Sequence, residues 1–141
     1  MFRQLVLDGW NRVFPKTTLG RRGEAAAERY LRRQGCKTLA RGSKSFLGEL
    51  DLVMLDRRTI VFVEVKTRRS ADLGHPVEAV HPEKQRRVTR AALAFLKRYG
   101  LLECPSRFDV VTVLWPENRR TPKIEHFPNA FEATGISGGY S

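Results

Sequence analysis

The chain has 141 residues, of which 41% are hydrophobic and 29% are charged. This size and composition indicate one globular domain with a hydrophobic core, and no apolar run is long enough to span a bilayer. The 26 Lys and Arg residues exceed the 15 Asp and Glu residues and give a net charge of +11, which favours a polyanionic partner such as nucleic acid or an acidic membrane surface.

The N-terminal residues 1–19 are expected to form an extension to the domain. Their apolar patches are compatible with a short amphipathic helix, an anchor or a frayed extension. Asp8, Asn11 and Arg12 interrupt any signal-peptide core, so we expect a cytoplasmic protein that does not associate with a membrane.

Helix and strand patterns then follow one another in chain order. A helix is predicted over residues 20–34 and ends at Gly35, and a short extended segment, CKTLAR, comes next. A second helix begins at Pro82 and ends at Gly100. The predicted strands are residues 48–56 and 59–66, joined by the tight turn DRRT, then 107–115 and a short edge strand, KIEHF.

This order predicts a single α/β domain over residues 20–130 with one central sheet. The chain from Pro128 onward is expected to be disordered, with residues 131–141 as a flexible tail. Asp109 lies within an apolar strand, and we expect it to pair with Arg107 or with a neighbouring helix because an unpaired buried charge is costly.

Charged residues alternate with apolar ones in the first two long strands. Glu49 and Asp51 share one face of the first strand, and Glu64 and Lys66 share one face of the second. A hairpin through the tight turn would bring Asp51 and Glu64 close together. Two neighbouring carboxylates repel each other unless a cation lies between them, and carboxylate oxygens prefer Mg²⁺ or Mn²⁺.

Lys66 would project from the same face as Glu64, as a point charge beside the predicted metal. It could hold an attacking water or stabilise charge on a scissile phosphate, which together with a metal would support phosphodiester hydrolysis. The alternative is structural charge pairing, with Lys66 bridging Asp51 or Glu64.

Clusters of basic residues are the candidate contacts to nucleic acid. They are Arg21, Arg22, Arg68, Arg69, Lys84 and Arg87. The alternative is that each cluster is a solvated helix face or turn, and for Lys84 and Arg87 a solvated helix face is favoured.

Six sequence blocks carry a resemblance to a known family. They are GEAAA at 23–27, YL at 30–31, Gly35, GELDLV at 48–53, VFVEVKTR at 61–68 and RFDVV at 107–111. Together they resemble the YraN (UPF0102) family, which is regarded as nuclease-like. The pattern of Asp51 followed by Glu64-Val65-Lys66 also resembles the signature of the PD-(D/E)XK nuclease superfamily, which includes archaeal Holliday-junction resolvases, although Leu50 replaces the signature proline.

The resemblance implies a metal site. Asp51 and Glu64 would be the central ligands, the Val65 carbonyl would be a third, and Glu49 would be a supporting acid. The implied cofactor is Mg²⁺ or Mn²⁺.

The resemblance also implies a fold and further roles. The fold would be a restriction-endonuclease-like α-β-β-β-α-β core, in which helices flank a central mixed sheet. Lys66 would be the catalytic lysine, and Glu24 would be the helix-borne acid that junction resolvases place beside the metal. A homodimer is a further implication, since junction resolvases act as dimers.

Two functions therefore remain open. The first is a metal-dependent endonuclease that hydrolyses phosphodiester bonds in DNA, in preference to RNA, with branched or damaged DNA as candidate substrates. The second is a non-catalytic nucleic-acid-binding protein on a nuclease-like scaffold. Beside these two, a further reading is a protein-interaction domain whose basic surface meets an acidic partner.

Overall fold

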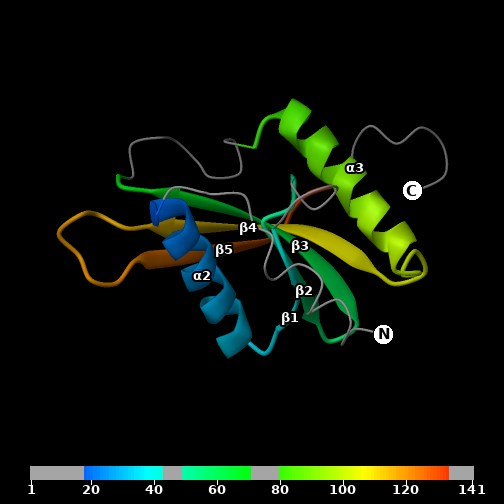
Figure 1. The fold of residues 1–141 in the computed structure, drawn as a ribbon, viewed down its shortest axis with the longest axis horizontal. Helices are drawn as coiled ribbons and strands as arrows, with labels where there is room; N and C mark the ends of the chain where they lie inside the picture. The colour runs from blue at the N-terminus through cyan, green and yellow to red at the C-terminus, as the bar shows by residue number, and fades with distance from the viewer. Residues whose placement is uncertain (1–17, 43–48, 71–79, 134–141) are drawn as a thin grey trace.

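The structure, a computed structural model, describes residues 18–42, 49–70 and 80–133, and these form two helices and five strands (Figure 1). In chain order the elements are α2 (Thr18–Arg33), β1 (Lys37–Arg41), β2 (Leu52–Asp56), β3 (Thr59–Arg68), α3 (Pro82–Arg98), β4 (Ser106–Leu114) and β5 (Lys123–Phe131). Most of the predicted N-terminal extension lies outside the described residues. No helix among the described residues is long and apolar enough to cross a bilayer.

The five strands form one mixed sheet in the order β1-β2-β3-β4-β5. β1, β2 and β3 are antiparallel neighbours, β3 and β4 are parallel, and β5 is antiparallel to β4. α3 provides the crossover between β3 and β4, because parallel neighbours cannot be joined by a tight turn. This arrangement confirms the predicted single α/β domain with an α-β-β-β-α-β core, and β5 extends the sheet by one strand.

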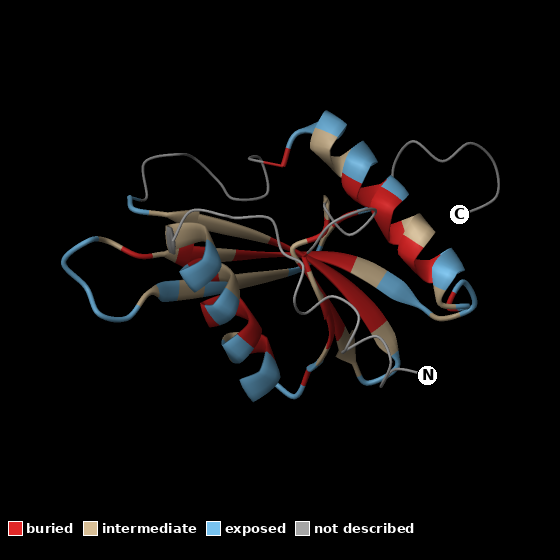
Figure 2. Ribbon diagram, in the orientation of Figure 1, coloured by how far each residue is buried: buried red, intermediate tan, exposed pale blue. Residues whose placement is uncertain are grey.

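Each face of the sheet packs against one helix, so the protein has three layers (Figure 2). On one face, Val53 and Phe62 belong to the buried cluster that includes Phe95 of α3. On the other face, Met54 and Val61 belong to the cluster that includes α2 residues. The alternation predicted for the two central strands is therefore confirmed: even-numbered positions of β3 face α3, and odd-numbered positions face α2.

Both helices end at a glycine in the left-handed region, as the sequence predicts. Gly35 has φ +102°, and the N–H of Cys36 donates to the Leu31 carbonyl over 3.1 Å. Gly100, with φ +67°, ends α3 in the same way. These hydrogen bonds satisfy carbonyls that the last helical turn would otherwise leave without partners.

α2 lies unusually close to β3 at one point. A Cβ atom on Gly23 would overlap the side chain of Thr67, so only glycine permits this approach. Because Thr67 follows Lys66 directly, the contact holds the start of α2 beside the end of the strand that carries the predicted catalytic lysine.

The structure corrects the predicted disordered tail. β5 continues through Pro128 to Phe131, beyond the expected edge strand. Pro128 is tolerated because β5 is an edge strand, and the pairing with β4 shifts register between Phe108 and Val110. The Asp109 carboxylate accepts the N–H of Asn129 over 2.9 Å, which ties this irregular segment to the sheet. The rest of the predicted tail, from residue 134, lies outside the described residues.

Candidate functional site

Asp51 and Glu64 lie next to each other where the pairing of β2 and β3 ends. Leu52 pairs with Val63, so the next residue on each chain is Asp51 or Glu64. β2 begins at Leu52 and not at residue 48 as predicted, because the Asp51 side chain replaces the next bond of the ladder. Its Oδ2 accepts the N–H of Val65 over 2.8 Å. The sequence thus predicted the proximity of the two acids correctly, but placed Asp51 inside the strand.

Glu64 is a buried carboxylate that two lysine ammonium groups approach. Its residue is 5% exposed. Lys66 Nζ lies 3.6 Å and Lys84 Nζ 3.9 Å from Glu64 Oε1. Burial raises the pKa of Glu64, nearby Asp51 raises it further, and the two lysines only partly offset these effects, so that the pKa reaches about 7. A positively charged ligand would stabilise the ionised form of this carboxyl group.

The beginning of α3 adds further charged residues to the cluster formed by Asp51, Glu64 and Lys66. Besides its contact with Glu64, Lys84 Nζ lies 3.3 Å from Glu49 Oε2. Arg87 Nε lies 3.6 Å from the same Glu49 oxygen. From the sequence, Lys84 and Arg87 are predicted only as contacts to nucleic acid. A crossover helix returns over the sheet, and even-numbered β3 residues face α3, so this topology was the signal that could have placed Lys84 beside Glu64.

Glu64 should make the stability of the metal-free protein depend on pH. The unfolded chain loses the Glu64 proton near pH 4.5, and the folded chain retains it to about pH 7. The folded state therefore binds more protons in this interval, and the free energy of unfolding attributable to Glu64 falls as the pH rises from 4.5 to about 7. Glu64→Gln removes this loss and should stabilise the protein by about 3 kcal/mol at pH 8 and by little at pH 4.5.

Urea denaturation in EDTA across this pH range measures the difference. Glu125→Gln is the matched control, since Glu125 is exposed on β5 and loses the same charge. A stability difference between Glu64→Gln and wild type that does not grow with pH would contradict the prediction.

The oxygen atoms of Asp51 and Glu64 fit a hard divalent cation. Among the described residues, no group of three or more His, Cys, Asp and Glu side chains could hold a metal ion. Mg²⁺ does not require such a group, because it commonly binds through one or two carboxylates, with waters and substrate phosphates completing its shell. Glu49 is already paired with Lys84 and Arg87, so its predicted role as a supporting acid stays a prediction.

Glu24 lies on α2, in the layer opposite α3, and is half-buried. It follows Gly23, the residue that packs against Thr67, and so stands near the end of β3. Its predicted role as a helix-borne acid beside the metal stays a prediction.

Two groups of the predicted basic residues, one at the start of α2 and one at the end of β3, meet at Trp115, which directly follows β4. The guanidinium of Arg22 lies 4.1 Å from the centre of the Trp115 ring, a cation–π contact. Arg69 donates to the Trp115 carbonyl over 3.1 Å. Arg21 is exposed and Arg68 is half-buried nearby in the chain. The start of α2 and the end of β3 therefore carry one basic cluster and not two separate ones.

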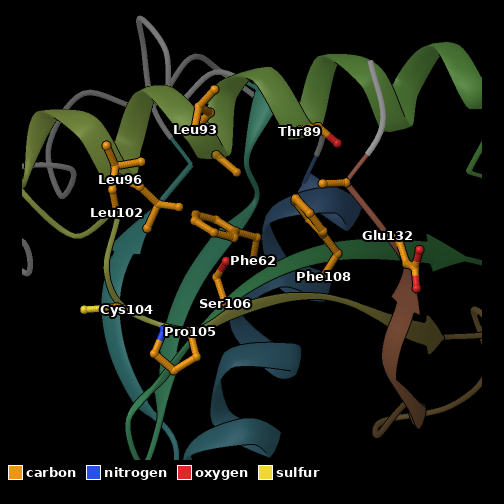
Figure 3. Close-up of a pocket in the computed structure, with 12 residues that line it drawn as sticks. Phe62, Thr89, Leu93, Leu96, Leu102, Cys104, Pro105, Ser106, Phe108 and Glu132 are labelled. Atoms are coloured by element: carbon orange, nitrogen blue, oxygen red, sulfur yellow. The ribbon is translucent and has the colours of Figure 1, made fainter. Parts of the chain in front are cut away.

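An apolar pocket of about 480 Å³ lies elsewhere on the α3 side of the sheet (Figure 3). Phe62, Phe108 and Leu96 are among its walls, and Leu102 at its edge is 39% exposed. Its described lining contains none of the predicted site residues, and Glu132 is the one acidic side chain in that lining. The predicted site residues therefore lie outside this pocket.

The fold defines a single-domain α/β protein in which helices cover both faces of a mixed five-stranded sheet. The chain belongs to the family described as Uncharacterised protein family UPF0102, whose family model matches residues 23–113.

Bacterial proteins of the same family are similar over most of the chain. A UPF0102 protein of Rhodopirellula baltica is 48% identical over 125 residues, which cover 86% of this chain and 75% of the relative. A UPF0102 protein of Geobacter sulfurreducens is 49% identical over 116 residues, covering 81% of this chain and 88% of the relative. A third, from Chlorobium phaeobacteroides, is 46% identical over 117 residues, covering 80% and 93%. The predicted family resemblance is confirmed.

Proposed function

We propose that the protein is a metal-dependent endonuclease that hydrolyses phosphodiester bonds in DNA. The observation that carries this proposal is the pairing of Asp51 with buried Glu64, beside Lys66. A buried carboxyl group whose pKa is raised, next to a second carboxylate, is costly as a purely structural feature. It becomes useful where a cation and a negatively charged substrate have to be bound together.

Asp51 and Glu64 would hold Mg²⁺ or Mn²⁺, with the Val65 carbonyl as a third ligand. The N–H and carbonyl of one residue point to the same side of a strand, and the Val65 N–H points toward Asp51. The Val65 carbonyl is therefore directed toward the side on which Asp51 lies. The bound metal would polarise the phosphate and favour ionisation of the attacking water.

Lys66 would act on the substrate phosphate. Its ammonium group carries a fixed positive charge beside Glu64, and it would stabilise the negative charge that develops on a phosphate oxygen as water attacks phosphorus. The bond from phosphorus to the leaving deoxyribose oxygen would then break, and that oxygen would be protonated from solvent. Arg22 and Arg69, held at Trp115, would contact phosphates outside the reacting one.

One observation favours a second function, a non-catalytic protein that binds nucleic acid. Lys84 already compensates Glu49 and approaches Glu64, so part of the acidic charge is paired without a metal. Under this alternative the carboxylates would hold the start of α3 against the sheet, and the basic residues would bind phosphates.

Mn²⁺ binding separates the two functions. The loss of the free-ion electron paramagnetic resonance signal is compared for wild type and Asp51→Asn/Glu64→Gln, with and without short duplex DNA. The endonuclease proposal expects uptake by wild type alone, together with nicking of supercoiled DNA that requires Mg²⁺ or Mn²⁺ and stops in EDTA. Equal Mn²⁺ uptake by both proteins would overturn it and leave the carboxylates as ion-pair partners.

A further inference from the structure

The solvent face of α2 is almost entirely basic. Its exposed residues are Arg21, Arg22, Ala25, Arg29, Arg32 and Arg33. Neither acid of the helix belongs to this exposed face, because Glu24 is half-buried and Glu28 is buried. Figure 2 shows this helix with its buried residues toward the sheet and its exposed residues on the outer side.

The C-terminal half of this face has the character of an anion-binding surface. Among the described residues, no carboxylate lies within ion-pair distance of Arg29, Arg32 or Arg33. These three side chains, with Arg41 of β1, line a cavity of about 360 Å³. We call these four residues the α2 arginine face. Three exposed guanidinium groups that no described carboxylate pairs with repel one another, so an anion between them would lower the electrostatic energy.

Glu28 also lines the cavity, but within the α2 arginine face it pairs with Arg41 alone. Its carboxylate accepts two hydrogen bonds from Arg41, of 2.9 and 2.7 Å, and a third from the Thr38 hydroxyl over 2.6 Å. These bonds occupy the carboxylate within the protein and fix the position of Arg41. Ala25 is small and exposed, so the backbone of a polyanion can approach the helix closely at this point.

The composition of α2 argues for nucleic acid and against a lipid surface. A helix that binds a bilayer inserts large apolar side chains from its non-basic side. Here that side is already buried, because Ala26, Ala27 and Leu31 belong to the core between α2 and the sheet. From Arg22 to Arg33 the helix covers about 17 Å, a length over which duplex DNA presents about ten phosphate charges.

We propose that the α2 arginine face binds the phosphate backbone of duplex nucleic acid, as a contact surface separate from the Asp51–Glu64–Lys66 cluster. The inference rests on the nucleic-acid part of the proposed function and does not require cleavage. Arg22, at Trp115, connects the two surfaces, since it begins the basic row that ends at Arg33. The duplex is thus held along α2 while the end of β3 faces the reacting phosphate.

The test is the affinity of Arg29→Ala/Arg32→Ala/Arg33→Ala for a short labelled duplex in EDTA, measured by fluorescence anisotropy over a series of KCl concentrations. Alanine keeps the helix, because it has the highest helix propensity. We expect affinity to fall by at least about tenfold, and the slope of log affinity against log salt to become shallower by about 2 to 3. The matched control, Arg58→Ala/Lys97→Ala/Arg98→Ala, removes three exposed charges from other elements and should leave the slope close to that of wild type.

Equal loss by both triple variants would overturn the proposal, because it would show a response to net charge alone. An unchanged slope in the α2 variant would also overturn it. Vesicles of phosphatidylcholine and phosphatidylserine provide the third arm: loss of vesicle binding with unchanged duplex affinity would assign the face to anionic lipid instead. Because the duplex assay contains no metal, failure of the Mn²⁺ experiment leaves this result intact, and the converse also holds.

Discussion

Replacement of Lys66 by alanine is expected to lower the rate of DNA cleavage by about 10²- to 10³-fold while Mn²⁺ binding is retained. In the proposed mechanism, Lys66 would supply charge to the transition state but no ligand to the metal. Its Nζ lies 3.6 Å from Glu64, and its removal takes a positive charge away from the predicted ligands. Metal affinity should therefore remain the same or rise, and duplex affinity should change little.

Single-turnover cleavage and Mn²⁺ titration of the same samples measure the two effects separately. Lys123→Ala is the control, because Lys123 is an exposed lysine on β5 that pairs only loosely, at 4.0 Å, with Glu125. Lys66→Arg retains the charge and should recover part of the rate. If Lys66→Ala cleaved DNA within about tenfold of wild type, Lys66 would have no catalytic role.

Replacement of Asp109 by alanine is expected to lower the free energy of unfolding by about 3 kcal/mol or more at pH 7. Asp109 is fully buried and receives hydrogen bonds from Arg107, from His126 and from the backbone of Asn129. Burial alone would raise the pKa of Asp109, but these bonds outweigh it and lower the pKa below its usual value. The carboxylate therefore stabilises the fold above its unfolded pKa of 3.8, and this contribution is lost as the pH falls through the lower folded pKa.

Asp56→Ala is the matched control for this prediction. Asp56 contacts the same Arg107, at 3.1 Å, but its side chain is 35% exposed. Its removal should cost less than about 1 kcal/mol, because exposed ion pairs contribute little. Urea denaturation of both variants at pH 7 gives the comparison, and equal losses would show that the Asp109 network adds nothing beyond an ordinary surface pair.

The parts of the structure that the sequence predicted well depend on short-range patterns. The alternation of Val61, Phe62 and Val63 between two faces follows from strand geometry alone. The two-residue turn between Asp56 and Thr59 fixes the register that brings Asp51 beside Glu64.

The parts that were missed depend on contacts between distant segments. Lys84 reaches Glu64 only because α3 returns over β3. Helical periodicity in the sequence does not show which strand the first turn of a helix will cover. The expected pairing of Asp109 with Arg107 is confirmed, since both lie on β4. Its bond to Asn129 could not be predicted, because Pro128 suggested that the chain beyond the edge strand is disordered. Its bond to His126 depends on the pairing of β4 with β5, which residue spacing does not show.

The irregular outer strands of the sheet limit how copies of the chain can associate. Among the described residues β1 and β5 are the edge strands; β1 shifts register between Thr38 and Ala40, and β5 contains Pro128. A bulge and a proline both interrupt the row of donors and acceptors that an incoming strand would need. Edge-to-edge growth into a continuous sheet, a common route to aggregation, is thereby disfavoured, and a homodimer would be built from helix surfaces and not from a shared sheet.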